Sequence, residues 1–208
     1  MAGFKNIIFD LGGVIINVDI NLTYLKFCQF GINENKKEFY DKFIDDSILF
    51  KYEMGRISTD DFFEEIQKRF SVNVEKNAIL EAWNALLLDI PDERIELLKK
   101  LSKKYNLYLL SNTNEEHYNT IISRFINRYG CNIFDEIFIK QYYSHLQSMR
   151  KPAKEIFEFV LAHGRLAPEE TFFVDDNEQN IASAKTCGIQ THLLLQGTTL
   201  ADLFKNEL

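Results

Sequence analysis

The first strong pattern in the chain is a short apolar run that ends in a carboxylate. Residues 6–9 lead into Asp10, and Gly12 and Gly13 follow after a single leucine. A short apolar run closed by glycines predicts a strand that is buried in a parallel sheet and opens into a tight loop. Ligands bind at the carboxyl ends of such strands, where glycines let backbone amides approach an anion. Asp10 is therefore expected at the mouth of a crevice, although an aspartate in this place could also simply cap a turn.

The next part of the chain, residues 19–88, has the periodicity of helices and few features of strands. Ser58 and Asp61 form the pattern of a capping box, and Gly31 and Gly55 mark breaks between helices. Apolar residues recur at helical spacing in three stripes, which are Phe39, Tyr40, Phe43 and Ile44, then Phe62, Phe63, Ile66 and Phe70, and finally Ile79, Leu80, Trp83, Leu86 and Leu87. Such stripes are typical of faces that pack against other helices. We therefore predict a small helical bundle with its own core over residues 18–89.

After Pro91, apolar runs of strand length alternate with helical stripes. Helices are predicted over residues 92–104, 115–129, 151–164 and 178–187, and strands over residues 107–110, 136–139, 171–174 and 190–195, with a loop over residues 142–150. Strands that alternate with helices predict a parallel, doubly wound sheet. The expected fold is therefore α/β: a Rossmann-like sheet built by residues 1–17 and 90–208, with an inserted all-α domain at residues 18–89.

Composition limits the functions that this chain can have. Its 208 residues suit one domain or a core with an insert, and 46% hydrophobic residues are ample for a buried core. A net charge of −7 and a pI near 5.2 provide no basic surface for nucleic acid or anionic lipid. Cys28, Cys131 and Cys187 stand far apart, which indicates free thiols in a reducing compartment. Because no targeting or membrane-spanning stretch is present, we expect a cytoplasmic protein without nucleic-acid or membrane partners.

Three of the predicted strands end in polar residues, and a lysine stands just before a predicted helix. These residues are Asp10, Ser111 and Asn112, Asp175 and Asp176, and Lys151. Each alone has an ordinary structural explanation, such as a turn, a surface charge or a helix cap. Parallel strands, however, bring their carboxyl ends to the same edge of a sheet, so these groups can converge. Carboxylates, a hydroxyl, an amide and a lysine together form a site for a divalent cation and a phosphate.

The order and spacing of these motifs resemble the haloacid dehalogenase (HAD) superfamily of hydrolases. The motifs are Phe9-Asp10-Leu11-Gly12-Gly13-Val14, Leu110-Ser111-Asn112-Thr113, Arg150-Lys151-Pro152 and Phe173-Val174-Asp175-Asp176-Asn177. The resemblance covers the whole chain, because the helical stretch at residues 18–89 is similar to the cap domain that many members insert after the first motif. Within the superfamily, the chain looks most like bacterial sugar phosphatases of the glucose-1-phosphate phosphatase type.

The resemblance implies a Mg²⁺-dependent phosphomonoester hydrolase that acts on a small phosphorylated metabolite. Asp10 would be the nucleophile and form an aspartyl-phosphate, which suits a carboxylate that is already ionised at neutral pH. Asp10, Asp176 and the Gly12 backbone carbonyl would hold Mg²⁺, with Asp175 and Asn180 as supports. The resemblance also implies three phosphate-binding groups, which are the Ser111 hydroxyl, the Asn112 amide and the Lys151 ammonium group.

One position departs from the superfamily's pattern. Its phosphatases usually carry a second aspartate two residues after the nucleophile, as general acid and base, and this chain has Gly12 there. The loss of such a group is worth about a hundredfold to ten-thousandfold in rate. Asp19 or His117 could donate the proton instead, the substrate could have a leaving group that needs little help, or the protein could be a feeble catalyst that mainly binds ligands.

Two rival functions remain open from the sequence. A dehalogenase would also lack the second aspartate, but its attack on carbon needs no Mg²⁺ and gives Asp175 and Asp176 little to do. A non-catalytic phosphate-binding or regulatory module on the same fold is the second rival, and Gly12 is the feature that favours it. The sequence leaves the substrate and the oligomeric state open.

Overall fold

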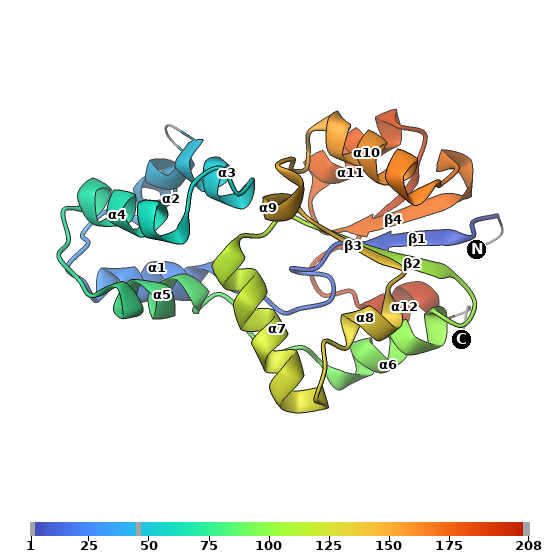
Figure 1. Cartoon of the computed structure of the whole chain (residues 1–208), viewed down its shortest axis with the longest axis horizontal. Coiled ribbons are helices and arrows are strands. Elements are labelled where there is room, and N and C mark those ends of the chain that lie inside the picture. Colours follow the sequence, from blue (N-terminus) through green and yellow to red (C-terminus); the bar gives the residue numbers. More distant parts are fainter. Residues whose placement is uncertain (1–2, 45–46, 206–208) are drawn as a thin grey trace.

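The computed structural model describes residues 3–44 and 47–205, and its centre is one parallel sheet (Figure 1). The strands are β1 (Asn6–Phe9), β2 (Asn106–Ser111), β3 (Lys140–Tyr143), β4 (Thr171–Asp175) and β5 (Gln190–Leu193). They pair in parallel in the order β3-β2-β1-β4-β5. The first strand of the chain therefore lies in the middle, and the order reverses beside it. The predicted α/β class and doubly wound parallel sheet are confirmed.

Helices cover both faces of this sheet. On one face lie α6 (Asp92–Leu101), α7 (Glu115–Tyr129), α8 (Phe134–Ile137) and α12 (Leu200–Phe204), and on the other lie α10 (Lys154–Gly164) and α11 (Glu178–Thr186). Successive side chains of a strand point to opposite faces. Ile7 and Phe9 accordingly belong to the first apolar cluster and Ile8 to the second, and all three are fully buried. We call β1–β5 with α6–α12 the sheet core.

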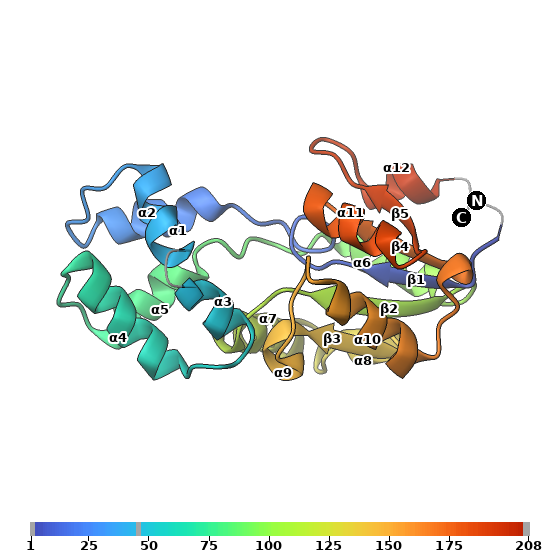
Figure 2. The ribbon, with the colours of Figure 1, turned by 90° about the horizontal axis from the view of Figure 1, so that it is seen from above.

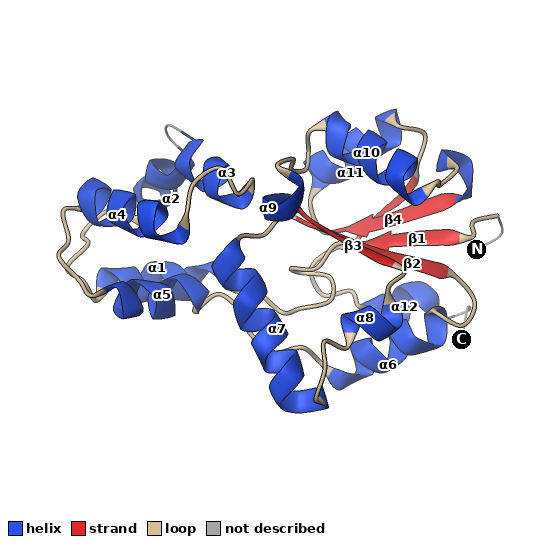
Figure 3. Cartoon of the chain, in the orientation of Figure 1, coloured by secondary structure: helices blue, strands red, loops and turns tan. Residues whose placement is uncertain are grey.

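In the part of the chain that the structure describes, five α-helices between β1 and α6 form a separate bundle (Figures 2 and 3). They are α1 (Ile20–Cys28), α2 (Lys36–Ile44), α3 (Ile48–Glu53), α4 (Thr59–Phe70) and α5 (Lys76–Asn84). Aromatic rings fill their common interior, where Phe62 packs against both Tyr52 and Trp83. Ser58 caps α4 in the predicted capping box with Asp61. The side chain of Ile44, which belongs to the predicted first stripe, lies outside the described part of the chain.

Two chain segments connect the helical bundle to the sheet core and pair with each other. The Asn17 backbone amide donates to the Asp89 carbonyl at 3.0 Å, and the Leu88 amide donates to the Asn17 carbonyl at 3.0 Å. Leu86 and Leu87, predicted to belong to a bundle stripe, pack instead against the apolar cluster of the sheet core. The correction has a simple cause, because α5 ends at Asn84 and the helical periodicity no longer sets where these leucines point.

Several other predicted boundaries were wrong. Residues 136–139 were expected to be a strand, but α8 continues to Ile137 and β3 begins only at Lys140. An apolar run of this length fits a strand and a buried helical turn equally well. Lys151 and Pro152 precede α10 instead of opening it, and the expected loop at residues 142–150 contains the end of β3 and the short helix α9 (Ser144–Gln147).

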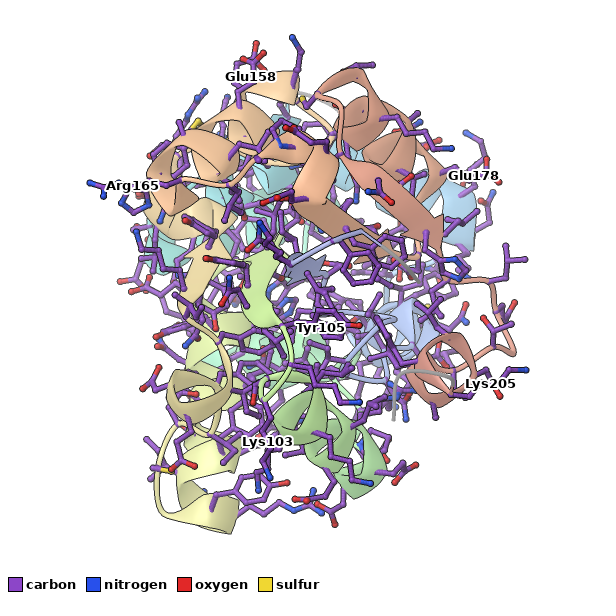
Figure 4. All side chains as sticks on the ribbon, turned by 90° about the vertical axis from the view of Figure 1, so that its right-hand side faces the viewer. Lys103, Tyr105, Glu158, Arg165, Glu178 and Lys205 are labelled. Atoms are coloured by element: carbon purple, nitrogen blue, oxygen red, sulfur yellow. The ribbon has the colours of Figure 1, made fainter. Side chains whose placement is uncertain are left out.

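Charged side chains lie at the end of the sheet core away from the bundle. Figure 4 shows this end, where the exposed side chains of Glu158, Arg165 and Lys205 point outward. The three cysteines are unpaired, as expected. No helix in the described part of the chain combines the length and the apolar character that a membrane crossing requires. The strands direct their carboxyl ends toward the bundle, so the candidate site lies between the two parts of the molecule (Figure 1).

Candidate active site

The polar residues at the strand ends meet at one edge of the sheet. Parallel pairing sets Phe9 of β1 beside Leu109 of β2 and Val174 of β4. Asp10 follows Phe9 and is held in the same register, because its backbone amide donates to the Val174 carbonyl at 2.9 Å. Asp175 closes β4 directly beside it. The structure therefore places Asp10 and Asp175, which are distant in the sequence, together in one buried site.

Lys151 lies at the centre of this buried site. Its side chain is 1% exposed, and the ammonium nitrogen donates to Asp10 Oδ1 at 2.7 Å and to Asp175 Oδ2 at 2.6 Å. A third bond, of 2.9 Å, goes to the Leu110 carbonyl. An ammonium group has three donors, so these partners use all of them. Lys151 is thus fixed in orientation and fixes the carboxylates in turn.

Asn112 holds the backbone of the same lysine. Its Oδ1 accepts from the Lys151 amide at 2.8 Å, and its Nδ2 donates to the Lys151 carbonyl at 2.8 Å. Both functional atoms of the Asn112 side chain are therefore engaged with the lysine backbone. The sequence indicated only a role in phosphate binding for Asn112, which stays a prediction. The support that it gives to Lys151 was not foreseen, because it joins two segments that are distant in the chain.

Ser111, at the end of β2, is another of the predicted site residues. Ser111 is buried, and its hydroxyl makes a long contact of 3.4 Å with the Asn112 carbonyl. The hydroxyl of Ser144, at the start of α9, accepts from the Thr113 amide and donates to the Thr113 carbonyl, each at 2.9 Å. Ser144 was not predicted as a site residue from the sequence, where the available signal was its position directly after the strand β3. These bonds fix the loop that follows Ser111.

Asp175 is held more tightly than any other carboxylate here. The Asn177 amide donates to Asp175 Oδ1 at 2.8 Å, and the side-chain amide of Asn180 lies 3.0 Å from both carboxylate oxygens. Together with the ammonium group of Lys151, these donors engage both carboxylate oxygens of Asp175. Asp175 is thus suited to orient its neighbours. The support that the resemblance assigns to Asp175 and Asn180 fits this geometry.

The carboxylates are close enough to share one cation. Single oxygens of Asp10, Asp175 and Asp176 all lie within 4.8 Å of one another. When all three carboxylates are ionised, they and the ammonium group of Lys151 leave two negative charges in excess, which a divalent cation balances. Carboxylate and carbonyl oxygens are the ligands that Mg²⁺ prefers. The donor set therefore fits magnesium.

Gly13 makes room for one of these carboxylates. Its φ of +73° is in the region that favours glycine, and a Cβ placed there would lie 2.1 Å from Asp176 Oδ2. Asp176 is the exposed member of the cluster. The second glycine after Asp10 thus has a steric purpose, because it lets the Asp176 carboxylate lie against the loop after β1.

The electrostatics of the site favour a bound cation. Burial raises the pKa of Asp10 to about 7; Lys151 offsets part of this effect and Asp175 adds to it. Burial and the charge of Asp175 also raise the pKa of Asp176. Burial alone would lower the pKa of Lys151, but the two neighbouring carboxylates outweigh it and hold that pKa above its ordinary value. A cation beside the carboxylates would return them to the ionised form.

A small cavity of about 80 Å³ adjoins Gly12, and Ser111 and His117 are among the residues that line it. His117 is buried, and its two ring nitrogens contact the Asn114 side chain at 3.0 Å and the Trp83 carbonyl at 3.2 Å. Burial lowers the pKa of His117 to about 4, so this ring is neutral at neutral pH. Both ring nitrogens are thus already engaged, and the contact with Trp83 joins α7 to α5.

The second alternative proton donor, Asp19, also has a local partner. Its carboxylate accepts from the Asn21 backbone amide at 2.9 Å and caps the amino terminus of α1. The structure therefore assigns structural bonds to both residues that the sequence offered in place of the missing aspartate. Neither bond supplies a proton donor next to Asp10, and Gly12 itself has no side chain that could donate a proton.

Comparison with known proteins identifies related sequences. A family model described as haloacid dehalogenase-like hydrolase matches residues 4–188. The chain is 30% identical over 187 residues to a D-ribitol-5-phosphate phosphatase from Bacteroides thetaiotaomicron, and the match covers 90% of each chain.

Solved structures of HAD enzymes are also similar to this chain. A HAD family enzyme from Bacteroides thetaiotaomicron, solved in complex with magnesium and inorganic phosphate, superimposes with a TM-score of 0.87 and 36% identity over 97% of this chain and 100% of that one. A predicted HAD-like family hydrolase from Porphyromonas gingivalis gives a TM-score of 0.86 and 28% identity, over 99% and 98% of the two chains.

Proposed function

This chain belongs to the haloacid dehalogenase-like hydrolase family, and from that premise we propose that it is a Mg²⁺-dependent phosphomonoester hydrolase. The observation that carries the proposal is the buried ammonium group of Lys151, which Asp10 and Asp175 share beside Asp176. The magnesium and phosphate bound to a structural relative support the same chemistry.

Asp10 is the proposed nucleophile. A carboxylate oxygen of Asp10 forms a bond to phosphorus while the ester oxygen leaves, takes up a proton and departs as the alcohol. Water then attacks the aspartyl-phosphate, which releases inorganic phosphate and restores Asp10. Lys151 fixes the rotation of the attacking carboxylate through its bond to Oδ1 and places positive charge beside the transferring group.

The remaining residues bind and position. Asp10, Asp176 and the Gly12 carbonyl would hold Mg²⁺, which would neutralise charge that develops on the phosphoryl group. Asp175 orients Lys151 through its bond of 2.6 Å. The Ser111 hydroxyl is proposed to bind a phosphoryl oxygen. Asn112 contributes by holding the Lys151 backbone, in addition to the phosphate contact that the resemblance implies.

The helical bundle is proposed to act as the cap, with boundaries near residues 18 and 89. It lies beyond the carboxyl ends of the strands, where it can cover Asp10, exclude water and select the substrate. Small sugar phosphates and sugar-alcohol phosphates are the first substrates to test, because a 30% identical relative is named for D-ribitol 5-phosphate.

The dehalogenase alternative is less well supported. Displacement at carbon has no use for a cluster of three carboxylates within 4.8 Å. The alternative of a non-catalytic module rests on Gly12 alone. Beryllofluoride binding at Asp10 without turnover of any ester would favour that alternative, and halide release from a 2-haloacid without metal would favour the dehalogenase.

The deciding experiment measures phosphate release from a panel of pentitol, pentose and hexose phosphates, with p-nitrophenyl phosphate as a general substrate. We expect turnover only with Mg²⁺, its loss on chelation, and a fall of more than about a thousandfold in Asp10→Asn. Mass spectrometry should find a phosphoryl group on the peptide that contains Asp10. Equal turnover by wild type and Asp10→Asn would contradict the proposal.

A further inference from the structure

An ion pair joins the helical bundle to the sheet core next to Lys151. The guanidinium Nε of Arg150 donates to Glu53 Oε2, at the end of α3, at 2.8 Å. The same guanidinium lies over the ring of Phe50, 4.1 Å from its centroid. The two charged side chains are only 21% and 16% exposed. This is a well-packed pair between parts of the molecule that are distant in the sequence.

Other close contacts between the bundle and the sheet core lie on the same side of the bundle as the pair of Glu53 and Arg150. A Cβ at Gly55 would lie 2.2 Å from the carbonyl oxygen of His145, so the backbones of the α3–α4 turn and of α9 nearly touch. Arg56 donates to the Ser148 carbonyl at 3.4 Å, and the Thr59 hydroxyl donates to Glu115 at 3.0 Å. In both ribbon views, α3 faces α9 (Figures 1 and 2). The two connecting segments lie elsewhere, along α7, where Arg124 donates to the Leu87 carbonyl.

The pair is also connected to the reaction centre. Arg150 directly precedes Lys151, and Asn112 holds the Lys151 backbone on its other side. Burial raises the pKa of Glu53, while Arg150 and, more weakly, Lys151 counteract this rise. Glu53 therefore lies within the electrostatic reach of Lys151. A displacement of Glu53 would leave Arg150, the residue beside Lys151, without its ion-pair partner.

We propose that Glu53 and Arg150 form a positioning contact that holds the bundle closed over Asp10 and fixes the segment that carries Lys151. The kinetic part of this inference rests on the proposed phosphatase function, and the structural part does not. Removal of one partner leaves the other charge largely buried without its counter-charge, which opposes the closed arrangement. An exposed ion pair has no such effect.

The kinetic test is a double-mutant cycle with Glu53→Gln and Arg150→Met on the full chain with Mg²⁺. We expect each single variant to lower kcat/KM about tenfold, mainly through kcat, because Lys151 acts in the chemical step. The double variant should also lose about tenfold, since the two residues act as a unit. The matched control is Asp60→Asn, which breaks the exposed Lys76–Asp60 pair within the bundle and should keep wild-type kinetics. A loss of about a hundredfold in the double variant means independent effects and overturns the proposal.

The second readout is amide hydrogen exchange of the Mg²⁺-loaded protein without substrate. In Glu53→Gln, exchange should be faster across residues 53–59 and 144–150, and unchanged in β1 and β4. Unchanged exchange in the first two segments overturns the closing contact whatever the kinetics show. Should the wild type hydrolyse no phosphate ester, the phosphatase assignment fails, and the exchange experiment still decides the contact between Glu53 and Arg150.

Discussion

Lys151 and Asp175 form a fully buried ion pair, with 2.6 Å between Nζ and Oδ2 and side chains that are 1% and 0% exposed. The same ammonium group reaches Asp10 at 2.7 Å. One ammonium group thus serves two carboxylates, one directly after β1 and the other at the end of β4. Lys151 links the proposed nucleophile to the anchored end of β4.

This arrangement makes Lys151 important for stability as well as for chemistry. In Lys151→Met, two buried carboxylates lose their counter-charge, and we expect the free energy of unfolding of the metal-free protein to fall by about 3–5 kcal/mol. Phosphatase activity should fall below detection. Urea denaturation measures the first effect. Lys154→Met is the control, because Lys154 and its partner Glu158 are both half exposed, and its effect should stay within about 0.5 kcal/mol. Equal stability of Lys151→Met and wild type would contradict this account.

The pKa of Asp10 predicts an unusual pH dependence of stability in the metal-free protein. Because burial raises this pKa from 3.8 to about 7, the folded protein keeps a proton that the unfolded chain has already released. Stability must therefore fall as the pH rises through this window. Relative to Asp10→Asn, which does not titrate, wild type should lose up to about 1.4 kcal/mol per pH unit between pH 5 and pH 7.

The measurement is urea unfolding at a series of pH values, with chelator and then with saturating Mg²⁺. The cation binds the ionised carboxylate, so Mg²⁺ should remove the loss of wild-type stability at neutral pH. Parallel curves for wild type and Asp10→Asn in chelator would show that the pKa of Asp10 is not raised.

Much of the site could be predicted because a parallel sheet orders its strand ends. Once β1, β2 and β4 were identified by their apolar runs, the convergence of Asp10, Ser111 and Asp175 followed from topology alone. Side-chain partners were harder to predict. The bond between Lys151 and Asp175 depends on a distance that no local pattern encodes, and so does the use of Asn112 to hold the lysine backbone.

The other features that were wrongly predicted or not predicted from the sequence depend on packing between distant segments. The run at residues 136–139 was ambiguous because Ile137 and Phe138 are buried in either a helix or a strand, and only contact with the sheet core decides. The ion pair between Glu53 and Arg150 requires the bundle to be placed on the sheet core, which depends on the two connecting segments. No periodicity in the sequence carries that information.

The two glycines after Asp10 should respond differently to substitution. Gly13→Ala forces a Cβ into the position of the Asp176 carboxylate in a conformation that alanine rarely adopts, so we expect the apparent affinity for Mg²⁺ to fall by about tenfold to a hundredfold. At Gly12, the nearest atom to an added Cβ is a methyl group of Val18 at 3.6 Å, an ordinary contact. Gly12→Ala should therefore bind Mg²⁺ like wild type. Mg²⁺ titration of activity compares the two, and an equal loss in both would show that the Asp176 contact is not the cause.

The space beside Gly12 allows a gain of function to be tested. Gly12→Asp supplies the carboxylate that the superfamily resemblance implies two residues after Asp10, and the small cavity beside Gly12 adjoins Ser111. If the missing general acid limits turnover, kcat should rise, by at most about a hundredfold, with an alkyl phosphate whose leaving group needs a proton. The rate with p-nitrophenyl phosphate should change little, because that leaving group departs without one. Gly12→Asn is the control for size and should show no gain with either substrate. A fall in Gly12→Asp with both substrates would mean that this site has adapted to glycine, with substrates whose leaving groups depart unaided.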